Sequence, residues 1–302
     1  MRIASSQYTA TMNSALQSTS EKVEHLTAQM ANGLRLQRPS DDPLASVRLS
    51  RLARADAIVS QYRDNIAALK SRLQTNESYL GGMSNDMQQA RDLLVWAADG
   101  ANSPADLASM ATSLKSLQDS LFYTCNSKDQ EGRYLFSGTA SATPTITYDP
   151  TAAPGARYTF TGNTATQDVV VGSGIRQAAN VSLDEMATLL NQVEVAATTL
   201  ASGVNVNTPA VHAVVAGALD AIDVAMNSVG SKIAGQGGAQ NILSTLDANH
   251  ANVDEADQQA AIDIGQLDYG DAATQLNSYT VALQATQKAY AKVSQLSLFN
   301  VL

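Results

Sequence analysis

The strongest constraint on the fold is a seven-residue repeat that runs unbroken from Leu52 to Leu94. Its gaps alternate between three and four residues, and 12 of its 13 positions are apolar or tyrosine. The positions are Leu52, Ala55, Val59, Tyr62, Ile66, Leu69, Leu73, Asn76, Leu80, Met83, Met87, Ala90 and Leu94. Because such a repeat places these side chains in one narrow seam, it requires a partner helix alongside.

Two further seams lie at the ends of the chain. The N-terminal seam comprises Thr9, Met12, Leu16, Thr19, Val23, Leu26 and Met30. The C-terminal seam comprises Ile262, Gly265, Tyr269, Ala272, Leu276, Tyr279, Leu283, Thr286, Tyr290 and Val293. Seams at both termini predict paired terminal helices and indicate assembly rather than catalysis. We expect the 52–94 seam to be satisfied within the monomer, and the two terminal seams to be completed in part by other subunits.

The periodicity predicts a mainly α chain with a small inserted β module, in an elongated coiled coil or helix bundle of paired N- and C-terminal helices. Helices are expected at 5–34, 43–98, 104–121, 183–201, from 209 onward and up to the C-terminus. Short alternating runs at 145–148, 157–161 and 167–171 predict three or four strands. We expect the β module at the tip farthest from the termini.

From this arrangement of helices and strands we predict three domains. The first is a terminal coiled-coil domain of residues 1–42 and 260–302. The second is an α-helical bundle of residues 43–138 and 180–259. The third is a small outer β domain of residues 139–179.

Local signals place the helix ends. In the segment Ser40, Asp41, Asp42 and Pro43, Asp42 is a good N-cap and Pro43 suits the first helical position. Residues 182–185 (Ser-Leu-Asp-Glu) predict a capping box before the fourth helix. The glycine-rich stretch 235–238 is a weak point, but the apolar stripe continues beyond it, so we expect the helix to run through.

Asn76 is the one polar residue of the 52–94 seam. A buried asparagine at such a position often fixes helix register at a cost in stability. The alternative is a solvated position near a helix end.

The charge distribution argues against nucleic acid as the main partner, because the net charge is -9. Residues 1–75 carry ten Lys or Arg against six Asp or Glu, whereas residues 181–302 carry three against twelve. A basic N-terminal arm and an acidic C-terminal arm would attract each other, although solvated helix faces would show the same counts. A basic stretch (Arg48, Arg51, Arg54, Arg63 and Arg72) suits pairing with an acidic neighbouring subunit.

We predict no catalytic, cofactor-binding or metal-ligating residues, and no enzyme activity. The three histidines, His25, His212 and His250, have no second ligand at zinc spacing. Cys125 is the only cysteine, so an intramolecular disulfide is impossible. The first residues do not form a signal peptide, and with no run of 18 apolar residues we expect no membrane insertion. The chain is then cytoplasmic or exported without a cleaved signal.

Several segments resemble the bacterial flagellin superfamily. The segment 34–43 (Leu-Arg-Leu-Gln-Arg-Pro-Ser-Asp-Asp-Pro) is similar to one that the family shares, as are 61–66, 80–103 and the ending 296–302. The prolines that flank Ser40 and Asp42, together with 132–138 (Gly-Arg-Tyr-Leu-Phe-Ser-Gly), resemble the branch that joins hook to filament. The segment 268–272 fits the C-terminal signature, although Gly270 replaces the usual alanine. The resemblance covers about residues 1–140 and 260–302.

The resemblance implies a structural subunit at the hook–filament junction, outside the cell, exported unfolded without a cleaved signal peptide. The implied partners are other copies in a ring-like layer, the first hook-associated protein, flagellin, and a cytosolic export chaperone on the C-terminal helix. Inter-subunit packing is expected at Met12, Leu16, Val23, Leu26, Met30, Leu276, Tyr279, Leu283, Tyr290, Val293, Leu298 and Phe299. The alternatives are a flagellin-type filament subunit and a helical tip or tape protein of a type III secretion system.

A further hypothesis is that an innate immune receptor of a host recognises this chain. Residues 87–94 resemble the flagellin segment that an innate immune receptor reads, with Arg91 and Leu94 in matching places. The alternative is a helix face packed inside the bundle, which we favour.

Overall fold

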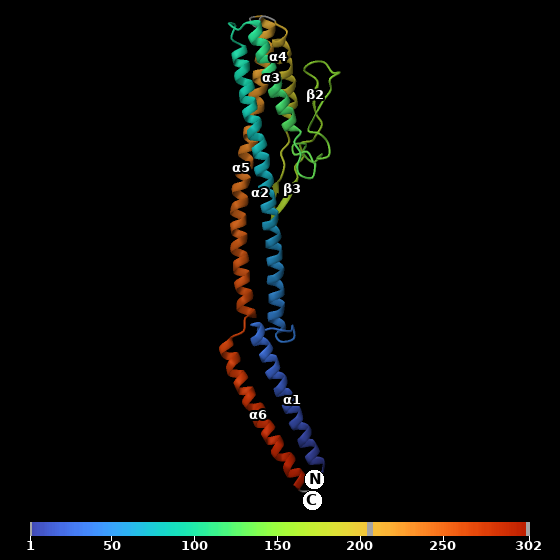
Figure 1. The fold of residues 1–302 in the computed structure, drawn as a ribbon, viewed down its shortest axis with the longest axis vertical. Coiled ribbons are helices and arrows are strands. Elements are labelled where there is room, and N and C mark those ends of the chain that lie inside the picture. The colour runs from blue at the N-terminus through green and yellow to red at the C-terminus, as the bar shows by residue number, and fades with distance from the viewer. Residues whose placement is uncertain (1, 204–207, 300–302) are drawn as a thin grey trace. The chain divides into compact units, whose positions relative to one another are not determined.

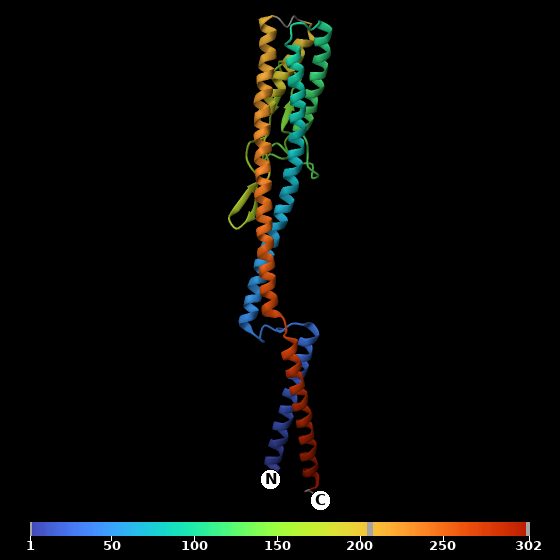
Figure 2. The same cartoon turned by 90° about the vertical axis from the view of Figure 1, so that its left-hand side faces the viewer.

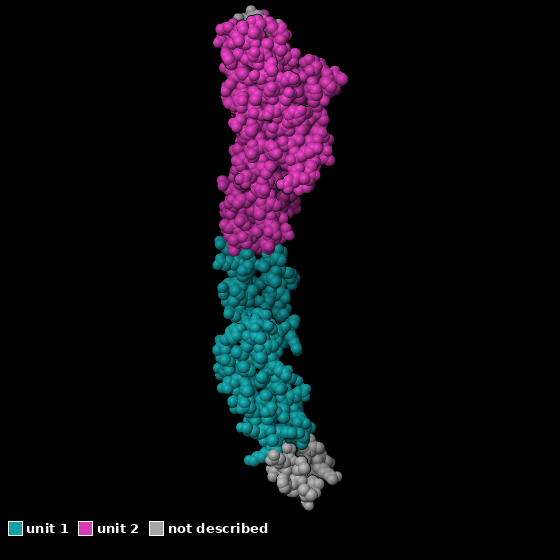
Figure 3. Space-filling view, viewed as in Figure 1, with its two compact units in different colours: residues 1–58, 252–302 teal, residues 59–251 magenta. Residues whose placement is uncertain are grey.

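The computed structural model describes residues 2–203 and 208–299, with side chains described over 7–203 and 208–292. Within those residues, Figure 1 shows a mainly helical chain with a small inserted β part, as predicted. The elements are α1 (Arg2–Asn32), α2 (Pro43–Ala97), α3 (Pro104–Cys125), β1 (Ile146–Tyr148), β2 (Tyr158–Phe160), β3 (Asp168–Gly172), β4 (Ile175–Ala178), α4 (Glu185–Ala201), α5 (Pro209–Gly265) and α6 (Tyr269–Phe299). The chain divides into two compact units, which Figure 3 colours separately: unit 1 is 1–58 with 252–302, and unit 2 is 59–251.

Unit 2 is a helical bundle with one large apolar core. In it α2 and α5 run side by side, and α3 packs on α4 (Figures 1 and 2). The α3 helix also folds back on α2, where the Ser120 hydroxyl donates to Asp86 at 2.7 Å. The core gathers apolar side chains from all four helices, among them Leu80, Met83, Leu114, Leu121, Leu190, Val215 and Ile222.

The α2 seam is buried within unit 2, as the repeat predicted. Every seam position from Ile66 to Leu94 is buried, and α2 continues through Gly81 and Gly82 without a break. Asn76 is fully buried, which excludes the solvated alternative. Its amide nitrogen and oxygen have no hydrogen-bond partner in the described part of the protein. The same holds for the amide of Gln236 on α5.

Two small hairpins make up the β part. β1 pairs antiparallel with β2, and β3 pairs antiparallel with β4, in two separate sheets of two strands each. They lie on the flank of the helices rather than at the end of the bundle, so the predicted tip position is wrong. The physical reason is apolar burial: Val171 and Ala179 pack against Ile66, Leu69 and Leu243 on the sides of α2 and α5.

Ion pairs tie the flanking elements of unit 2 to the bundle. The Arg157 guanidinium, just before β2, donates to the Glu194 carboxylate of α4 at 2.9 Å. Lys232 of α5 donates to Glu185 of α4 at 2.6 Å. Both carboxylates are mostly buried, so these pairs fix how α4 packs on α5 and on the β1–β2 hairpin.

The helix ends follow the local signals with one exception. Ser103 caps α3 in a capping box with Asp106, and α5 passes through the glycines at 235–238 without a break. The predicted capping box at 182–185 does not form, because α4 starts only at Glu185 and its N-cap Asp184 makes no side-chain capping bond. Glu185 instead binds Lys232.

The α5 helix is long and apolar enough, by length and composition alone, to span a membrane. Its apolar character comes largely from its many alanines. Asp220 and Asp223 interrupt the apolar run, so a search for 18 consecutive apolar residues does not detect this helix. In unit 2 this helix supplies Val215, Ala218 and Ile222 to the core. A core role therefore accounts for part of its composition, because 28% of its most apolar 18-residue window is buried.

Candidate functional site: the terminal helix pair

The terminal helices α1 and α6 pair within unit 1. They run antiparallel: the C-terminal end of α1, before the turn at Gly33, lies beside the N-terminal end of α6, after the turn at Asp268 (Figure 1). Leu26, Leu267 and Ala272 are buried between them, with Met30, Leu276 and Tyr279 packed around this small core. The Lys22 ammonium lies 5.6 Å from the Tyr279 ring centroid. Four of the predicted packing residues (Leu26, Met30, Leu276 and Tyr279) are thus brought together.

Away from this small core, the pair leaves its seam incomplete. The remaining predicted residues with described side chains are only half-buried: Met12, Leu16, Val23, Leu283 and Tyr290. Val281 is exposed on α6, and so is Tyr8 on α1. The side chains of Val293, Leu298 and Phe299 lie outside the described residues. Two helices alone therefore cover one side of each seam and leave apolar surface for a further partner.

Two short segments, 33–35 and 265–267, lie against each other and anchor the helix pair; we call this contact the crossing. The backbone N–H of Leu267 donates to the carbonyl oxygen of Gly33 at 3.0 Å, and that of Arg35 donates to Gly265 at 2.8 Å. The Arg35 guanidinium also donates to the carbonyl of Ile264. The Tyr269 hydroxyl donates to the carbonyl of Met30 at 3.1 Å. These bonds hold the end of α1 against the start of α6.

The crossing corrects one sequence interpretation. The C-terminal seam is not continuous from Ile262 to Val293, because α5 ends at Gly265 and α6 begins at Tyr269. Ile262 belongs to α5 and is exposed. The break has a local signal that the repeat obscures: the Asp268 carboxylate accepts the backbone N–H groups of Gly270 and Asp271, as an N-cap does.

The 40–43 turn holds the start of α2. The Asp42 carboxylate accepts the backbone N–H of Ala45 at 3.0 Å, and Pro43 is the first residue of α2, as predicted. Asp41 does not cap the helix; it accepts the N–H groups of Gln37 and Arg38 and closes the preceding turn. Ser40 is exposed. The bond from Arg38 holds the pKa of Asp41 below its usual value, and the bond from Ala45 does the same for Asp42.

The ionisable groups of the described chain do not gather into a metal site. No group of three His, Cys, Asp or Glu among the described residues could hold a metal ion. His25 lies 3.5 Å from the Asp41 carboxylate, and the His250 ring contacts the carbonyl oxygen of Val171 at 2.9 Å. Each of these contacts is explained by local packing.

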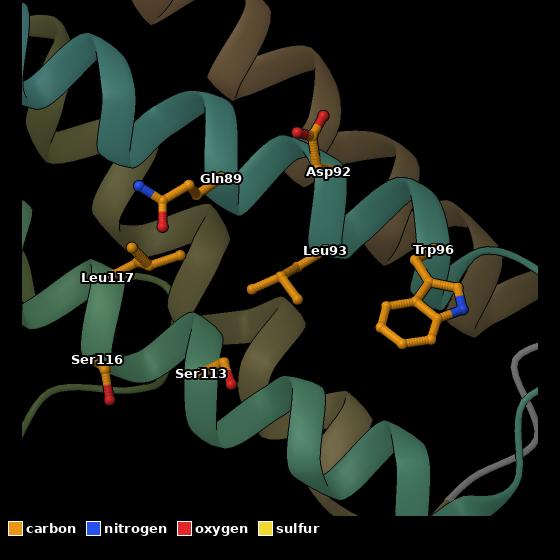
Figure 4. A pocket seen from close by; sticks show the side chains of 7 residues that line it. All are labelled: Gln89, Asp92, Leu93, Trp96, Ser113, Ser116 and Leu117. Atoms are coloured by element: carbon orange, nitrogen blue, oxygen red, sulfur yellow. The ribbon is translucent and has the colours of Figure 1, made fainter.

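One shallow groove lies on unit 2, between α2 and α3. Figure 4 shows its lining: Gln89, Asp92, Leu93, Trp96, Ser113, Ser116 and Leu117. Nearby, Leu94 is fully buried and Arg91 donates to Asp223 at 2.8 Å. This geometry favours the bundle-packing alternative over receptor recognition for the 87–94 segment, because a receptor would find only one of the two matching residues at the surface.

Comparison with known proteins agrees with this architecture. The family model for the bacterial flagellin N-terminal helical region matches residues 3–141. A solved structure from Vibrio parahaemolyticus, assigned as a flagellar hook-associated protein, is 31% identical and superposes with a TM-score of 0.68 over 75% of this chain and 100% of that one. This chain belongs to the bacterial flagellin superfamily.

Two curated members of the superfamily are similar in sequence. Flagellar hook-associated protein 3 of Escherichia coli is 27% identical over 290 residues, which cover 90% of each chain. The protein of the same name from Salmonella typhimurium is 37% identical over 113 residues, which cover 37% of this chain and 36% of that protein. Within the flagellin superfamily, the similarity is therefore to hook-associated proteins along most of the chain.

Proposed function

We propose that this chain is a structural subunit of the bacterial flagellum that joins the hook to the flagellin filament. The observation that carries the proposal is a contrast between two seams. The α2 seam is fully buried within unit 2 from Ile66 to Leu94, whereas the seams of α1 and α6 are mostly half-buried outside the small core around Leu26 and Ala272. A seam that its own chain leaves half covered is completed by helices of neighbouring subunits.

The proposed partners follow from the same surface. Other copies form a layer in the tube wall, the first hook-associated protein lies on the hook side and flagellin on the filament side. A cytosolic export chaperone covers the C-terminal helix before export, where the apolar seam would otherwise invite premature association. Export takes place without a cleaved signal peptide, and the one cysteine imposes no disulfide on an unfolded chain in transit. The chain carries out no enzymatic reaction and needs no cofactor.

Gene deletion tests the proposal directly. Loss of the junction subunit is expected to release flagellin monomers into the medium while hooks persist on the cell. A chain that instead forms the bulk filament would, when deleted, leave hooks that still carry their junction proteins. Hooks with normal filaments after deletion would overturn the proposal.

Point variants connect this phenotype to the terminal seams. Complementation with Leu16→Asp or Leu283→Asp should fail to restore filaments, because a charge in the seam opposes helix packing. The matched control is Ala108→Asp, at an exposed position of α3 in unit 2. It should restore filaments as well as the wild-type chain does.

A further inference from the structure

The exposed side of α2 in unit 1 carries a second heptad stripe, which the described chain leaves open to solvent. Its positions are Leu44, Val47, Arg51, Arg54 and Ile58, with gaps of 3, 4, 3 and 4. All five residues are exposed, and the three apolar members are each at least half exposed. The inner side of the same segment, with Ala45, faces the rest of unit 1. A 3-4 stripe with apolar ends and a basic centre is the pattern of a helix-binding face.

The arginines of this stripe have no acidic partner among the described residues. Arg51 makes no ion pair there, and Arg54 donates only to the carbonyl of Ser50, one turn earlier. Arg48, next to the stripe, is also exposed and unpaired within the described chain. Several other arginines are paired with an acid, among them Arg35 with Asp42 and Arg91 with Asp223. The α2 segment of unit 1 thus holds three arginines and a single aspartate, Asp56.

The neighbouring helix of unit 1 carries the opposite charge. The α5 segment 252–265 contains Asp254, Glu255, Asp257 and Asp263, and no lysine or arginine. Glu255 and Asp263 are exposed, and so is the apolar side chain of Ile262. Glu255 and Ile262 are seven residues apart and therefore lie on the same side of α5, with Asp263 beside them. This face matches the α2 stripe in kind, because it has acidic groups where α2 has basic ones and an apolar group beside them.

We propose that the basic α2 stripe of one copy docks on the acidic α5 face of the next copy. The occupant is a second copy of this chain because both complementary faces belong to the same unit 1. Since the two faces lie on different helices, the contact is heterologous: each copy presents a basic face to one neighbour and an acidic face to the other. Such a contact closes into a ring or propagates as a helical layer.

The inference rests on the proposed function, because it names the lateral contact by which copies of the subunit would form the junction layer. It assigns that contact to α2 and α5 of unit 1, in addition to the α1 and α6 seams. One helix face buries little area, so a single contact is weak and gains strength from repetition around the layer. Because the contact is electrostatic and exposed, it weakens as added salt shortens the screening length from about 10 Å at 0.1 M to about 3 Å at 1 M.

Charge reversal of the full-length chain tests the contact by sedimentation at high protein concentration. The basic-face variant, R51E/R54E, makes both faces acidic and is expected to weaken self-association at least about tenfold, because like charges then meet. The acidic-face variant, E255R/D263R, replaces the two exposed carboxylates of the α5 face by basic groups and is expected to have the same effect. All four positions are exposed, and circular dichroism checks that each variant folds.

Mixing supplies the decisive result. An equimolar mixture of the two variants is expected to regain association, because the acidic α2 of one variant meets the basic α5 of the other, and each remaining pair of faces is also opposite in charge. The matched control, K115E/R176E, reverses two basic residues of unit 2 and should leave self-association unchanged. Two variants that associate as the wild type does, or that fail to recover on mixing, would overturn the proposal.

A flagellar test keeps this inference separate from the proposed function. If the gene deletion releases flagellin but R51E/R54E restores the junction fully, the docking contact is wrong and the proposed function stands. If the deletion leaves filaments intact while the purified variants behave as described, the function is wrong and the contact stands. If R51E/R54E loses binding to another flagellar protein but keeps self-association, the occupant is that protein, and the proposal of a second copy is refuted.

Discussion

The backbone N–H of Arg35 donates to the carbonyl oxygen of Gly265 at 2.8 Å, joining two residues that are 230 positions apart. The bond lies at the crossing where α1 ends and α6 is about to begin. It has a counterpart in the bond from Leu267 to Gly33. The two bonds make a short antiparallel bridge that sets the register of the terminal helices, so the geometry at Gly33 controls the anchoring of the whole pair.

Gly33→Ala is expected to loosen the crossing. Gly33 has φ = 69°, and an added Cβ would lie 3.2 Å from the Tyr269 hydroxyl oxygen, so the variant suffers both backbone strain and crowding. The strain alone costs about 1–2 kcal/mol. Hydrogen exchange at the Leu267 amide should accelerate. Gly132→Ala is the matched control, because Gly132 also has positive φ but open space around its Cβ position. An unchanged Leu267 exchange rate in Gly33→Ala would contradict the assignment.

Leucine-to-alanine changes should separate the two kinds of seam. Leu80 is fully buried in unit 2, so Leu80→Ala is expected to lower the free energy of unfolding by about 2–5 kcal/mol. Leu283 is only half-buried on α6, so Leu283→Ala should lower it much less in the monomer and should impair assembly more. Chemical denaturation and filament complementation measure the two effects. Equal losses of monomer stability would show that the α6 seam is already complete.

The contrast between these seams shows how far periodicity predicts this fold. Spacing alone identified α2 and its buried face, because a repeat over 13 positions leaves one side for the core. Spacing also predicted one continuous seam across the break between Gly265 and Tyr269, because the seven-residue repeat has the same register on both sides of the break. The crossing depends on the backbone bonds from Leu267 to Gly33 and from Arg35 to Gly265, and a local pattern carries no information about such distant pairs.

The β part shows the same limit. The strands were located by alternation and turns, but their division into two hairpins depends on which helix sides bury Val171 and Tyr158. Likewise, the α2 stripe from Leu44 to Ile58 is visible in the sequence only once the inner seam has been assigned to the core. The sequence therefore predicted that basic residues of α2 form a contact surface, whereas the fold was needed to show which residues belong to it.

Asn76→Leu is expected to stabilise the monomer. The Asn76 amide is buried without a partner in the described chain, and leaving a buried polar group unsatisfied costs about 1–3 kcal/mol. Leucine has the same branched shape and the same number of side-chain heavy atoms, and it matches the other leucine and methionine residues of the seam. Chemical denaturation should show a higher midpoint. Ser78→Leu, at an exposed position on the side of α2 that faces away from the seam, is the control and should change the midpoint little. A lower midpoint for Asn76→Leu would indicate that the amide is hydrogen-bonded after all.

Cys125 should report on the unfolding of unit 2. Its side chain is fully buried at the end of α3, and burial raises the pKa of the thiol well above its usual value. Because the thiolate is the reactive form, a thiol reagent should label the native protein very slowly and the denatured protein at once. The labelling rate across a denaturant series should follow the unfolding of the α3 and α4 core. Fast labelling of the native chain would contradict this burial.

Asp56→Asn should stabilise unit 1 in a manner that depends on pH. The Asp254 carboxyl shares a hydrogen bond with Asp56, and this contact, with burial, raises the pKa of Asp56. A raised folded pKa means that the contribution of Asp56 to stability is fully present below its unfolded pKa of about 3.9 and is lost as pH rises through the folded pKa. Near neutral pH the two carboxylates therefore repel each other, and the variant should unfold at a higher temperature than the wild type. The difference should shrink as the pH falls towards the unfolded pKa.

Two comparisons make this pH test specific. Asp263→Asn removes an exposed carboxylate from α5, the helix that carries Asp254, and should not reproduce the pH-dependent gain. Asp42→Ala should act in the opposite direction, because the N–H of Ala45 lowers the pKa of Asp42. The stability that Asp42 contributes is present above its unfolded pKa and is lost as pH falls through the folded value. Thermal unfolding of the three variants across the acidic range measures all of these effects, and a gain for Asp56→Asn that is independent of pH would refute the carboxyl pair as its cause.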